Sequence, residues 1–431
     1  MRTRRSTAGL VAWAFYDFAN SSFAAVIQTF VFAAYFTQAV AETPQRGEQQ
    51  WGYAIAAAGG LVALGGPMLG AIADHTGRRK PWIAAFTLLC VASAALLWFV
   101  EPTPAHAGRA MLLLAVGVVG TEFAELFYNA MLPSLAPVER IGRWSGWAWG
   151  LGYLGGLLCL LLAYFGLIRP ASQPDAPDGA VETAVRATCL LVAAWHLVFS
   201  LPLLLLTPDE PRTAVSWRAA VRLGLSQLAD SVRHARRHGP LLRFLLARML
   251  YADGLATLFA FGGIFAASAF GLDTEHVLLF GILLQITAGI GAAAFAWADD
   301  RIGGRATILL ALGLLVPVTS AALAVRSETA FWILGAILGL FVGPVQAASR
   351  SYLARMAPAG LRNEMFGLFA LSGRATAYVG PLLVGSLTAA SGSSRVGLIV
   401  VPALLLAGLL LLRGVPRDAP GAAAGDEHAA T

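Results

Sequence analysis

Apolar runs of about 20 residues recur along the whole chain and are separated by short polar segments. A helix needs about this length to cross the hydrocarbon core of a bilayer. The pattern predicts twelve spans, at 12–40, 51–72, 81–100, 109–136, 143–168, 185–206, 241–270, 276–298, 305–325, 330–357, 364–390 and 394–413. We therefore expect an all-α integral membrane protein with twelve transmembrane helices.

Polar residues interrupt the first apolar run at Asp17, Asn20, Ser21 and Gln28. At helical periodicity this spacing places the four side chains on roughly one face. A carboxylate is costly in hydrocarbon, so that face should look into the protein interior or into a watery cavity.

The longest polar segment divides the predicted spans six and six. This pattern predicts six-helix bundles at 1–206 and 241–413, joined by a linker at 207–240. Within the linker, residues 216–237 have the spacing of an amphipathic helix, which would lie on the membrane surface or pack beneath the bundles. The Gly-, Ala- and Pro-rich residues 414–431 predict a disordered tail.

Composition supports the membrane assignment, because 58% of the 431 residues are hydrophobic and only 13% are charged. Arginine gathers in alternate loops, and this accounts for the net charge of +6 without a nucleic-acid partner. The bias places both termini in the cytoplasm, and we expect a multi-pass protein of a bacterial inner membrane. The length of the first run, and Asp17 within it, favour a retained span over a signal peptide.

Signals for catalysis are poor. The chain has no G-x4-G-K-[ST], H-E-x-x-H or C-x-x-C pattern, so ATP-driven, metalloprotease and thiol-redox functions are disfavoured. Cys90, Cys159 and Cys189 lie in apolar segments and predict neither a disulfide framework nor a metal site. We expect no enzyme activity, no cofactor and no metal, and we interpret His196 as a core histidine with satisfied hydrogen bonds.

The two halves of the chain repeat weakly. The echoes occur in the same order in both halves and pair Asp17 with Asp253, Asp74 with Asp300, Ala136-Pro137 with Ala357-Pro358, and Gly146 with Gly367. Parallel six-helix repeats are typical of two-bundle transporters.

The strongest local motif, G-x3-D-x2-G-R-R-K, follows the second span from Gly70 to Lys80. It resembles the loop signature of the major facilitator superfamily, in which a charge pair latches one state of the transport cycle. The resemblance implies gating roles for Asp74 and Arg78, and for Asp300 in the second copy, which departs from the pattern. The alternative is a turn that only fixes topology.

Four further segments are similar to the UMF1 branch of that superfamily, which includes the fungal autophagy-linked vacuole effluxers. They are Tyr16-Asp17-Phe18-Ala19-Asn20-Ser21, Phe127-Tyr128-Asn129-Ala130-Met131-Leu132-Pro133, Gln346-Ala347-Ala348-Ser349-Arg350-Ser351 and Asn363-Glu364-Met365-Phe366-Gly367. The resemblance implies a secondary transporter and, for the fungal members, amino-acid efflux.

Charged residues also lie deep within predicted spans. Glu122, Glu125 and Asn129 share one face of the fourth span, near mid-membrane. They could carry a proton or recognise a cation, or they could form a buried ion pair that holds helices together. Arg374 could bind a substrate carboxylate or pair with one of these glutamates.

Other polar residues are candidates for the cavity wall or for an inner gate. Asp17 and Asp253 could pair with Arg350 or Arg248 near the inner ends of equivalent helices. The remaining substrate or coupling candidates are Asn20, Gln28, Tyr128 and Gln346.

The sequence predicts a secondary active transporter that moves a small solute by alternating access, with proton coupling. Amino acids or similar zwitterions are the expected substrates and efflux the expected direction. We expect a monomer whose partners are the solute, protons and the lipid bilayer. The alternative is a transport-dead membrane sensor or scaffold with the same fold.

Overall fold

The computed structural model describes residues 7–211, 213–233, 239–272, 274–374, 376–377 and 379–417. Twelve helical segments of this part of the chain are long and apolar enough to cross a membrane, and each overlaps one predicted span. The expected all-α membrane fold is therefore confirmed. The bounds in the first half are α1 Thr7–Ser22, α2 Val31–Tyr35, α3 Pro44–Thr76, α4 Lys80–Leu96, α5 Ala107–Leu135, α6 Ile141–Ala163, α7 Arg169–Ala171 and α8 Ala180–Leu206.

The second half begins with the linker helix α9, Trp217–Arg233. The helices that follow are α10 Gly239–Phe270, α11 Thr274–Ile302, α12 Gly304–Ala324, α13 Glu328–Met356, α14 Arg362–Arg374, α15 Val379–Ser391, α16 Ser394–Gly397 and α17 Val400–Arg413. The predicted amphipathic helix at 216–237 thus matches α9, although residues 234–238 lie outside the described residues. So do residues 418–431 of the predicted tail.

The chain forms two compact units that do not coincide with the sequence halves. Unit 1 comprises Met1–Val62, Gly77–Tyr128 and Leu151–Arg212, and unit 2 comprises Ala63–Thr76, Asn129–Gly150 and Thr213–Thr431. The end of α3, the end of α5 and the first part of α6 therefore pack with the second half of the sequence. The bundle boundaries expected from sequence stay a prediction.

Unit 1 is built around the first span. Its core contains fully buried Phe23, Phe32 and Phe36, with Cys90 of α4 and Cys189 of α8 among their neighbours. The helices α1 and α8 pack together, and α8 also packs on α4. This unit buries the three cysteines, and none of them is in a disulfide.

The first span is not one regular α-helix. It is π-helical over Phe23–Phe30 and again over Phe36–Val40. A π-helical turn takes up extra residues and changes which side chains share a face. The single face expected for Asp17, Asn20, Ser21 and Gln28 therefore does not extend to Gln28, whose carbonyl oxygen accepts a hydrogen bond from Trp51 Nε1 at 3.3 Å.

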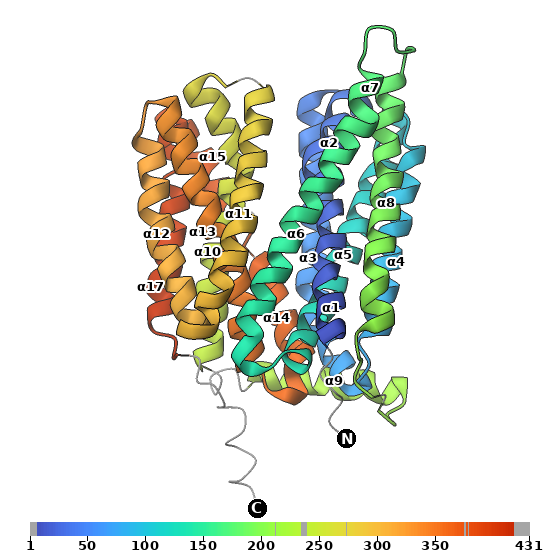
Figure 1. Cartoon of the computed structure of the whole chain (residues 1–431), viewed down its shortest axis with the longest axis vertical. Coiled ribbons are helices and arrows are strands. Elements are labelled where there is room, and N and C mark those ends of the chain that lie inside the picture. The colour runs from blue at the N-terminus through green and yellow to red at the C-terminus, as the bar shows by residue number, and fades with distance from the viewer. Residues whose placement is uncertain are drawn as a thin grey trace, which may run out of the picture. The chain divides into compact units, whose positions relative to one another are not determined.

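Unit 2 contains the helices drawn in yellow, orange and red in Figure 1. In it α10 packs on α17, α11 packs on α13, and α12 packs on both α13 and α17. Glycines allow the closest contacts with the segments from the first half. A side chain at Gly146 of α6 would overlap the Ala292 carbonyl of α11, and one at Gly367 of α14 would overlap the Gly66 carbonyl of α3.

The eleventh span is discontinuous. Its first part, α14, ends at Arg374, and its second part, α15, begins at Val379. Between them the N–H of Ala377 donates to the Arg374 carbonyl, and Val379 N–H donates to the Thr376 carbonyl. Ala375 and Tyr378 lie outside the described residues. The span predicted at 364–390 thus comprises two helices, and Arg374 stands at the break between them.

Candidate functional site

A carboxylate at the end of α3 binds the start of α14 within unit 2. Asp74 Oδ1 accepts hydrogen bonds from Asn363 N–H at 3.1 Å and from Asn363 Nδ2 at 2.7 Å. Asp74 Oδ2 accepts the N–H of Glu364 at 2.9 Å. The first N–H groups of a helix have no partner within the helix, and its positive dipole end favours an anion. Asp74 thus caps α14 from another helix.

A second carboxylate, that of Asp300, binds the start of α6 in the same unit. Asp300 Oδ1 accepts the N–H of Arg143 at 3.1 Å, and its Oδ2 lies 3.3 Å from Arg143 Nε. Arg355 of α13 lies 2.7 Å from Asp299 Oδ1 and 3.5 Å from Asp300 Oδ1. Ser351 donates to Asp299 Oδ2. The loop that departs from the motif is therefore still anchored to a segment of the first half.

The two contacts follow the sequence repeat. Asp74 and Asp300 are each followed three residues later by a glycine with positive φ, which is 80° at Gly77 and 86° at Gly303. The backbone of these glycines turns in a way that other residues rarely adopt. We call the contacts of Asp74 with α14 and of Asp300 with α6 the two carboxylate caps.

Arg350 lies between residues of α5 and α6 and is 1% exposed. Its Nε donates to Ser145 Oγ at 2.9 Å, its Nη2 to the Ser145 carbonyl at 2.7 Å, and its Nη1 to Asn129 Oδ1 at 3.1 Å. The guanidinium carbon lies 5.6 Å from the Trp149 ring centre. Ser145 Oγ in turn donates to the Ala347 carbonyl at 2.7 Å. We call Arg350, Asn129 and Ser145 the arginine cluster.

The basic triplet of the loop divides between surface and interior. Arg78 is exposed and has no ion-pair partner within the described ranges. Asp74, the acidic residue of the same motif, caps α14. Arg79 is 1% exposed and lies 2.8 Å from Glu210, while Asp209 accepts the N–H groups of Arg79 and Lys80 at 2.9 and 3.2 Å.

The linker is bound to the first carboxylate cap. Thr213 donates to the His75 carbonyl at 2.5 Å, and Gln227 of α9 donates to Glu364 Oε2 at 2.7 Å. Gly224 of α9 lies so close to the backbone of α3 that a side-chain carbon would be 2.7 Å from Ile72 N. The helix α9 thus lies against the start of α14 (Figure 1). The sequence allowed this helix either to lie on the membrane surface or to pack beneath the bundles. These contacts agree with packing.

Asp253 belongs to the break in the eleventh span. Its carboxylate accepts the N–H of Gly380, near the start of α15, with Oδ2 at 3.2 Å. It pairs with neither Arg248 nor Arg350 in the described part of the chain. Arg248 instead donates to the Phe369 carbonyl at 2.5 Å and to Ser372 Oγ at 2.8 Å, and its guanidinium stacks 3.4 Å from the Phe369 ring centre.

Unit 1 holds the remaining deep polar residues. Glu122 and Glu125 of α5 are partly exposed, whereas Asp17 and Asn20 of α1 are each 8% exposed. Asn20 Oδ1 is buried and has no hydrogen-bond partner among the described residues. Gln28 lies within the π-helical segment Phe23–Phe30, which turns it away from the face of Asp17 and Asn20.

Aromatic residues pack around Trp13 and Tyr16 of α1. Tyr128 stacks on Trp13 with ring centres 4.6 Å apart, and it lies 5.0 Å from the Tyr16 ring. The Trp13 indole donates to the Tyr128 carbonyl at 3.0 Å, and Tyr16 shares a 2.6 Å hydrogen bond with Thr87. Tyr128 is fully buried, so it packs within unit 1.

His196 differs from expectation. It is fully buried on α8, 6.0 Å from the Tyr16 ring, and neither ring nitrogen has a hydrogen-bond partner within the described ranges. The histidine is therefore in the core, but its hydrogen bonds are not satisfied by the described residues. No group of three or more His, Cys, Asp or Glu residues in those ranges is arranged to hold a metal ion.

Sequence reasoning identified Asp74, Asp300, Arg350 and its partner Asn129 as candidates, but it missed most of the other partners. Ser145, Asn363 and Arg355 come from distant segments, and Gln227 lies in the linker. Their side chains have no distinctive spacing in the sequence. One signal was available, because a helix start such as Asn363-Glu364 offers free N–H groups that the Asp74 carboxylate could accept. Gln346, one turn before Arg350 on α13, is partly exposed.

Comparison with known proteins gives two family matches. A family model described as "Vacuole effluxer Atg22 like" matches residues 137–420, and one described as "Major Facilitator Superfamily" matches residues 1–160. The chain is 27% identical over 416 residues to the uncharacterized MFS-type transporter YxiO of Bacillus subtilis. The aligned residues are 94% of each chain.

Two other similarities extend this picture. Autophagy-related protein 22-1 of Penicillium rubens is 23% identical over 299 residues, which are 64% of this chain and 49% of the relative. The chain thus spans about half the length of this fungal relative. The structure of the proton:xylose symporter XylE aligns with a TM-score of 0.71 at 14% identity, covering 95% of this chain and 96% of XylE. This likeness concerns the fold.

Proposed function

The chain belongs to the Atg22-like vacuole effluxer family of the major facilitator superfamily, and on that premise we propose that it exports a small solute by alternating access. It is a membrane transporter and not an enzyme. The direction, the substrate and the coupling ion are the parts that we propose. Amino acids or similar zwitterions are the substrate class, and protons are the coupling ion.

The arginine cluster is the observation that carries the proposal. Burying a guanidinium is costly, and a permanent contact is at least as stable when it is built from apolar side chains. A polar contact has a different advantage, because its groups can separate and bind water without exposing apolar surface. We therefore interpret Arg350, Asn129 and Ser145, together with the two carboxylate caps, as a gate that closes and opens in the transport cycle.

The gate lies at the end of unit 2 that also holds the loops after α3 and α11. These loops carry arginine, so this end is proposed to face the cytoplasm of a bacterial cell. With the gate closed, solute would enter or leave from the opposite side. Asp74, Asp300 and Arg350 are then gating residues, and the exposed Arg78 contributes only to topology.

The discontinuous eleventh span is the proposed place of substrate recognition. Transporters bind their substrates at helix breaks near mid-membrane, where backbone groups and helix ends become available. Arg374 stands at such a break, and its fork geometry suits a carboxylate. Asp253 fixes the start of α15 on the other side of the break. A zwitterion would present its carboxylate to Arg374, with Gln346 as a polar neighbour on α13.

Glu122 and Glu125 are the proposed proton carriers. Both lie deep in the fourth span, where a charged carboxylate is costly, and both are partly exposed. Protonation would remove that charge and change the preference between the two states of the cycle. Asn20 and Asp17 of α1 are polar residues of the same unit that can assist.

Flux into proteoliposomes tests the proposal. Purified protein should move labelled amino acids when a proton gradient or a solute gradient is imposed, and replacing both Glu122 and Glu125 by Gln should remove the dependence on the proton gradient. Exchange driven by a solute gradient should remain in that variant. Proton dependence that survives in the double variant would contradict the assigned carriers. If no solute moves under either gradient, a transport-dead sensor or scaffold is the better description.

A further inference from the structure

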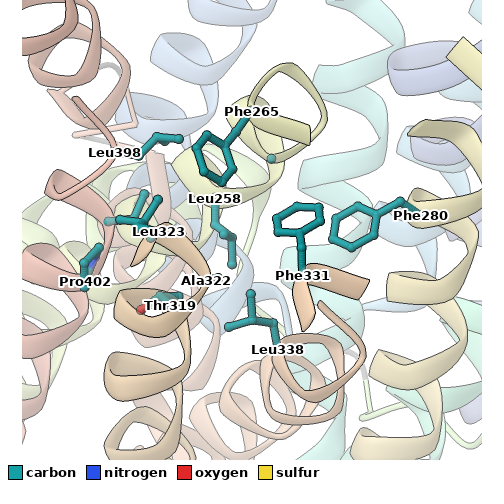
Figure 2. Close-up of a pocket in the computed structure, with 12 residues that line it drawn as sticks. Leu258, Phe265, Phe280, Thr319, Ala322, Leu323, Phe331, Leu338, Leu398 and Pro402 are labelled. Carbon is teal, nitrogen blue, oxygen red and sulfur yellow. The ribbon is translucent and has the colours of Figure 1, made fainter. Parts of the chain in front are cut away.

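A cavity lies inside unit 2, and none of its lining residues belongs to the gate or to the break at Arg374. It lies between α10, α11, α12, α13 and α17, and its space of about 450 Å³ includes the part that is open to the outside. Figure 2 shows Phe331 and Phe280 on one side of it and Leu323 and Pro402 on the other, with Phe265 and Leu398 towards one end.

The wall of this cavity is apolar throughout. Thr319 has the only side-chain polar atom among its lining residues, and its hydroxyl already donates to the carbonyls of Leu315 and Val316. Gly262 of α10 leaves its part of the wall open, because a side-chain carbon there would meet no atom within 4 Å. Such a wall can recognise a hydrocarbon chain but offers no hydrogen bond to a polar solute.

A cation is fixed at one end of the cavity. The guanidinium of Arg395 lies 5.4 Å from the ring centre of Phe265, which lines the cavity, and 5.6 Å from that of Phe270. Arg395 Nη1 donates to the carbonyls of Leu323 and Val325 at the end of α12. These contacts hold the guanidinium in place through Nη1, while its Nε and Nη2 make no hydrogen bond within the described residues.

The depth of the cavity fits one leaflet of a bilayer. Arg395 stands where α10 and α12 end and α13 begins, which is the level of the membrane surface for these spans. Leu338, at the other end of the lining, is ten residues inside α13, or about 15 Å at 1.5 Å per residue. This is half of the roughly 30 Å hydrocarbon core.

We propose that this cavity binds one acyl chain of an anionic phospholipid from the bilayer, with the lipid phosphate on Arg395. The neighbouring outward-facing side chains favour a lipid over a solute from water, because Phe259, Ile399 and Leu406 are exposed and apolar. The chain leaves the leaflet between these residues and fills the apolar wall, and the headgroup remains at the surface level, where Nε and Nη2 of Arg395 can donate to phosphate.

Lipid binding to the purified full-length protein in detergent tests this site. Native mass spectrometry and thermal shift are measured with dioleoylphosphatidylglycerol, dioleoylphosphatidylcholine and oleate. The phosphatidylglycerol should bind and raise the melting temperature. Gly262→Leu should abolish this binding because the new side chain occupies the cavity, and Arg395→Gln should weaken it about tenfold because charge-assisted hydrogen bonds are lost.

Matched controls separate the site from general lipid contact. Gly313 also meets no atom within 4 Å but is exposed on α12, and Arg326 is exposed in the following loop. Gly313→Leu and Arg326→Gln should bind phosphatidylglycerol as the native protein does. Leu258→Phe provides a second cavity-filling variant in case Gly262→Leu melts early. Undiminished binding in both cavity variants would overturn the proposal, and so would a shift produced by oleate or phosphatidylcholine but not by phosphatidylglycerol.

Discussion

Arg350 shows how one residue can join segments that are far apart in sequence. Three of its nitrogens donate to Asn129 and Ser145, which are more than 200 residues away in the chain. Hydrogen bonds to a charged group contribute about 1.5–3 kcal/mol each, and an ammonium cannot reproduce the fork geometry of a guanidinium. The contribution of Arg350 therefore depends on its shape as well as its charge.

Replacing Arg350 by Lys should open the gate. We expect a loss of about 2–4 kcal/mol from the closed state, because at least one hydrogen bond to Ser145 is removed. The measurement is the alkylation rate of a cysteine placed at the buried Ala136, in a background without the native cysteines. The rate should rise at least about tenfold. Arg301→Lys, at an exposed position, should leave it unchanged, and equal rates in the two variants would contradict the gate.

At the scale of helices, close packing through glycine sets where α14 and α6 can lie. Gly367 contacts the backbone of α3 directly, whereas Gly385 on α15 faces open space. The difference decides what a methyl group does at each position. At Gly385 it only adds helix propensity, but at Gly367 it forces two backbones apart.

Gly367→Ala should therefore destabilise the protein by about 1–3 kcal/mol, because the new carbon overlaps the Gly66 carbonyl. Gly385→Ala should be neutral or slightly stabilising. Melting of the two variants in the same detergent measures the difference. A melting temperature of Gly367→Ala that equals or exceeds that of Gly385→Ala would show that α14 does not pack so closely on α3.

The linker helix α9 offers an element-scale test of its own. Gly224→Leu should displace α9 from α3, because its side chain would meet the backbone of Ala71 and Ile72. Limited proteolysis within 213–233 should then become faster, since cleavage follows local opening. Ser226→Leu, at an exposed position of the same helix, is the control. Equal cleavage of both variants would mean that α9 is not held by this contact.

At the scale of the molecule, the two carboxylate caps act on different helix pairs. Asp74 holds α3 to α14, and Asp300 holds α11 to α6. If the gate opens only when both contacts break, their free energies add and the effects on the opening equilibrium multiply.

Asp74→Ala and Asp300→Ala should each raise the alkylation rate of the cysteine at position 136, and the double variant should show the product of the two increases. Asp178→Ala, in an exposed loop, is the control. A double variant no more reactive than the stronger single variant would show that one cap alone controls opening.

The number and order of the spans could be predicted because a long run of hydrophobic residues is the direct requirement for crossing lipid. The break after Arg374 could not, because residues 375–378 keep the apolar composition of the span, and the start of α15 depends on Asp253 from another helix. The π-helical segments of the first span also have no signal in the sequence pattern. They leave the spacing of polar residues unchanged in the sequence while rotating Gln28 away from Asn20.

Part of the candidate site could also be predicted, because some of its residues stand out in the sequence pattern. Asp74 and Asp300 follow a repeated loop, and Arg350 is a charge inside an apolar run. Ser145 and Gln227 carry no such signal, since a serine or a glutamine is unremarkable until its neighbours are known. Arg78 was assigned a gating role by resemblance to a motif, whereas the structure leaves it exposed and binds Asp74 to the backbone of α14.

The donors of the two carboxylate caps are largely main-chain N–H groups, and every residue except proline supplies one. Such a contact depends on where the helix begins. It depends much less on which side chains stand at the helix start. The loop after α11 can therefore lose most of its basic residues and still engage its partner, provided that Asp300 and Gly303 remain. Substitutions at positions 143 and 364 that preserve the helix start should be tolerated more readily than a shift of that start by a single residue. The gate should therefore be more sensitive to a change in helix length than to a change of side chain. A one-residue insertion moves the donor N–H groups by about 1.5 Å and turns them through about 100°.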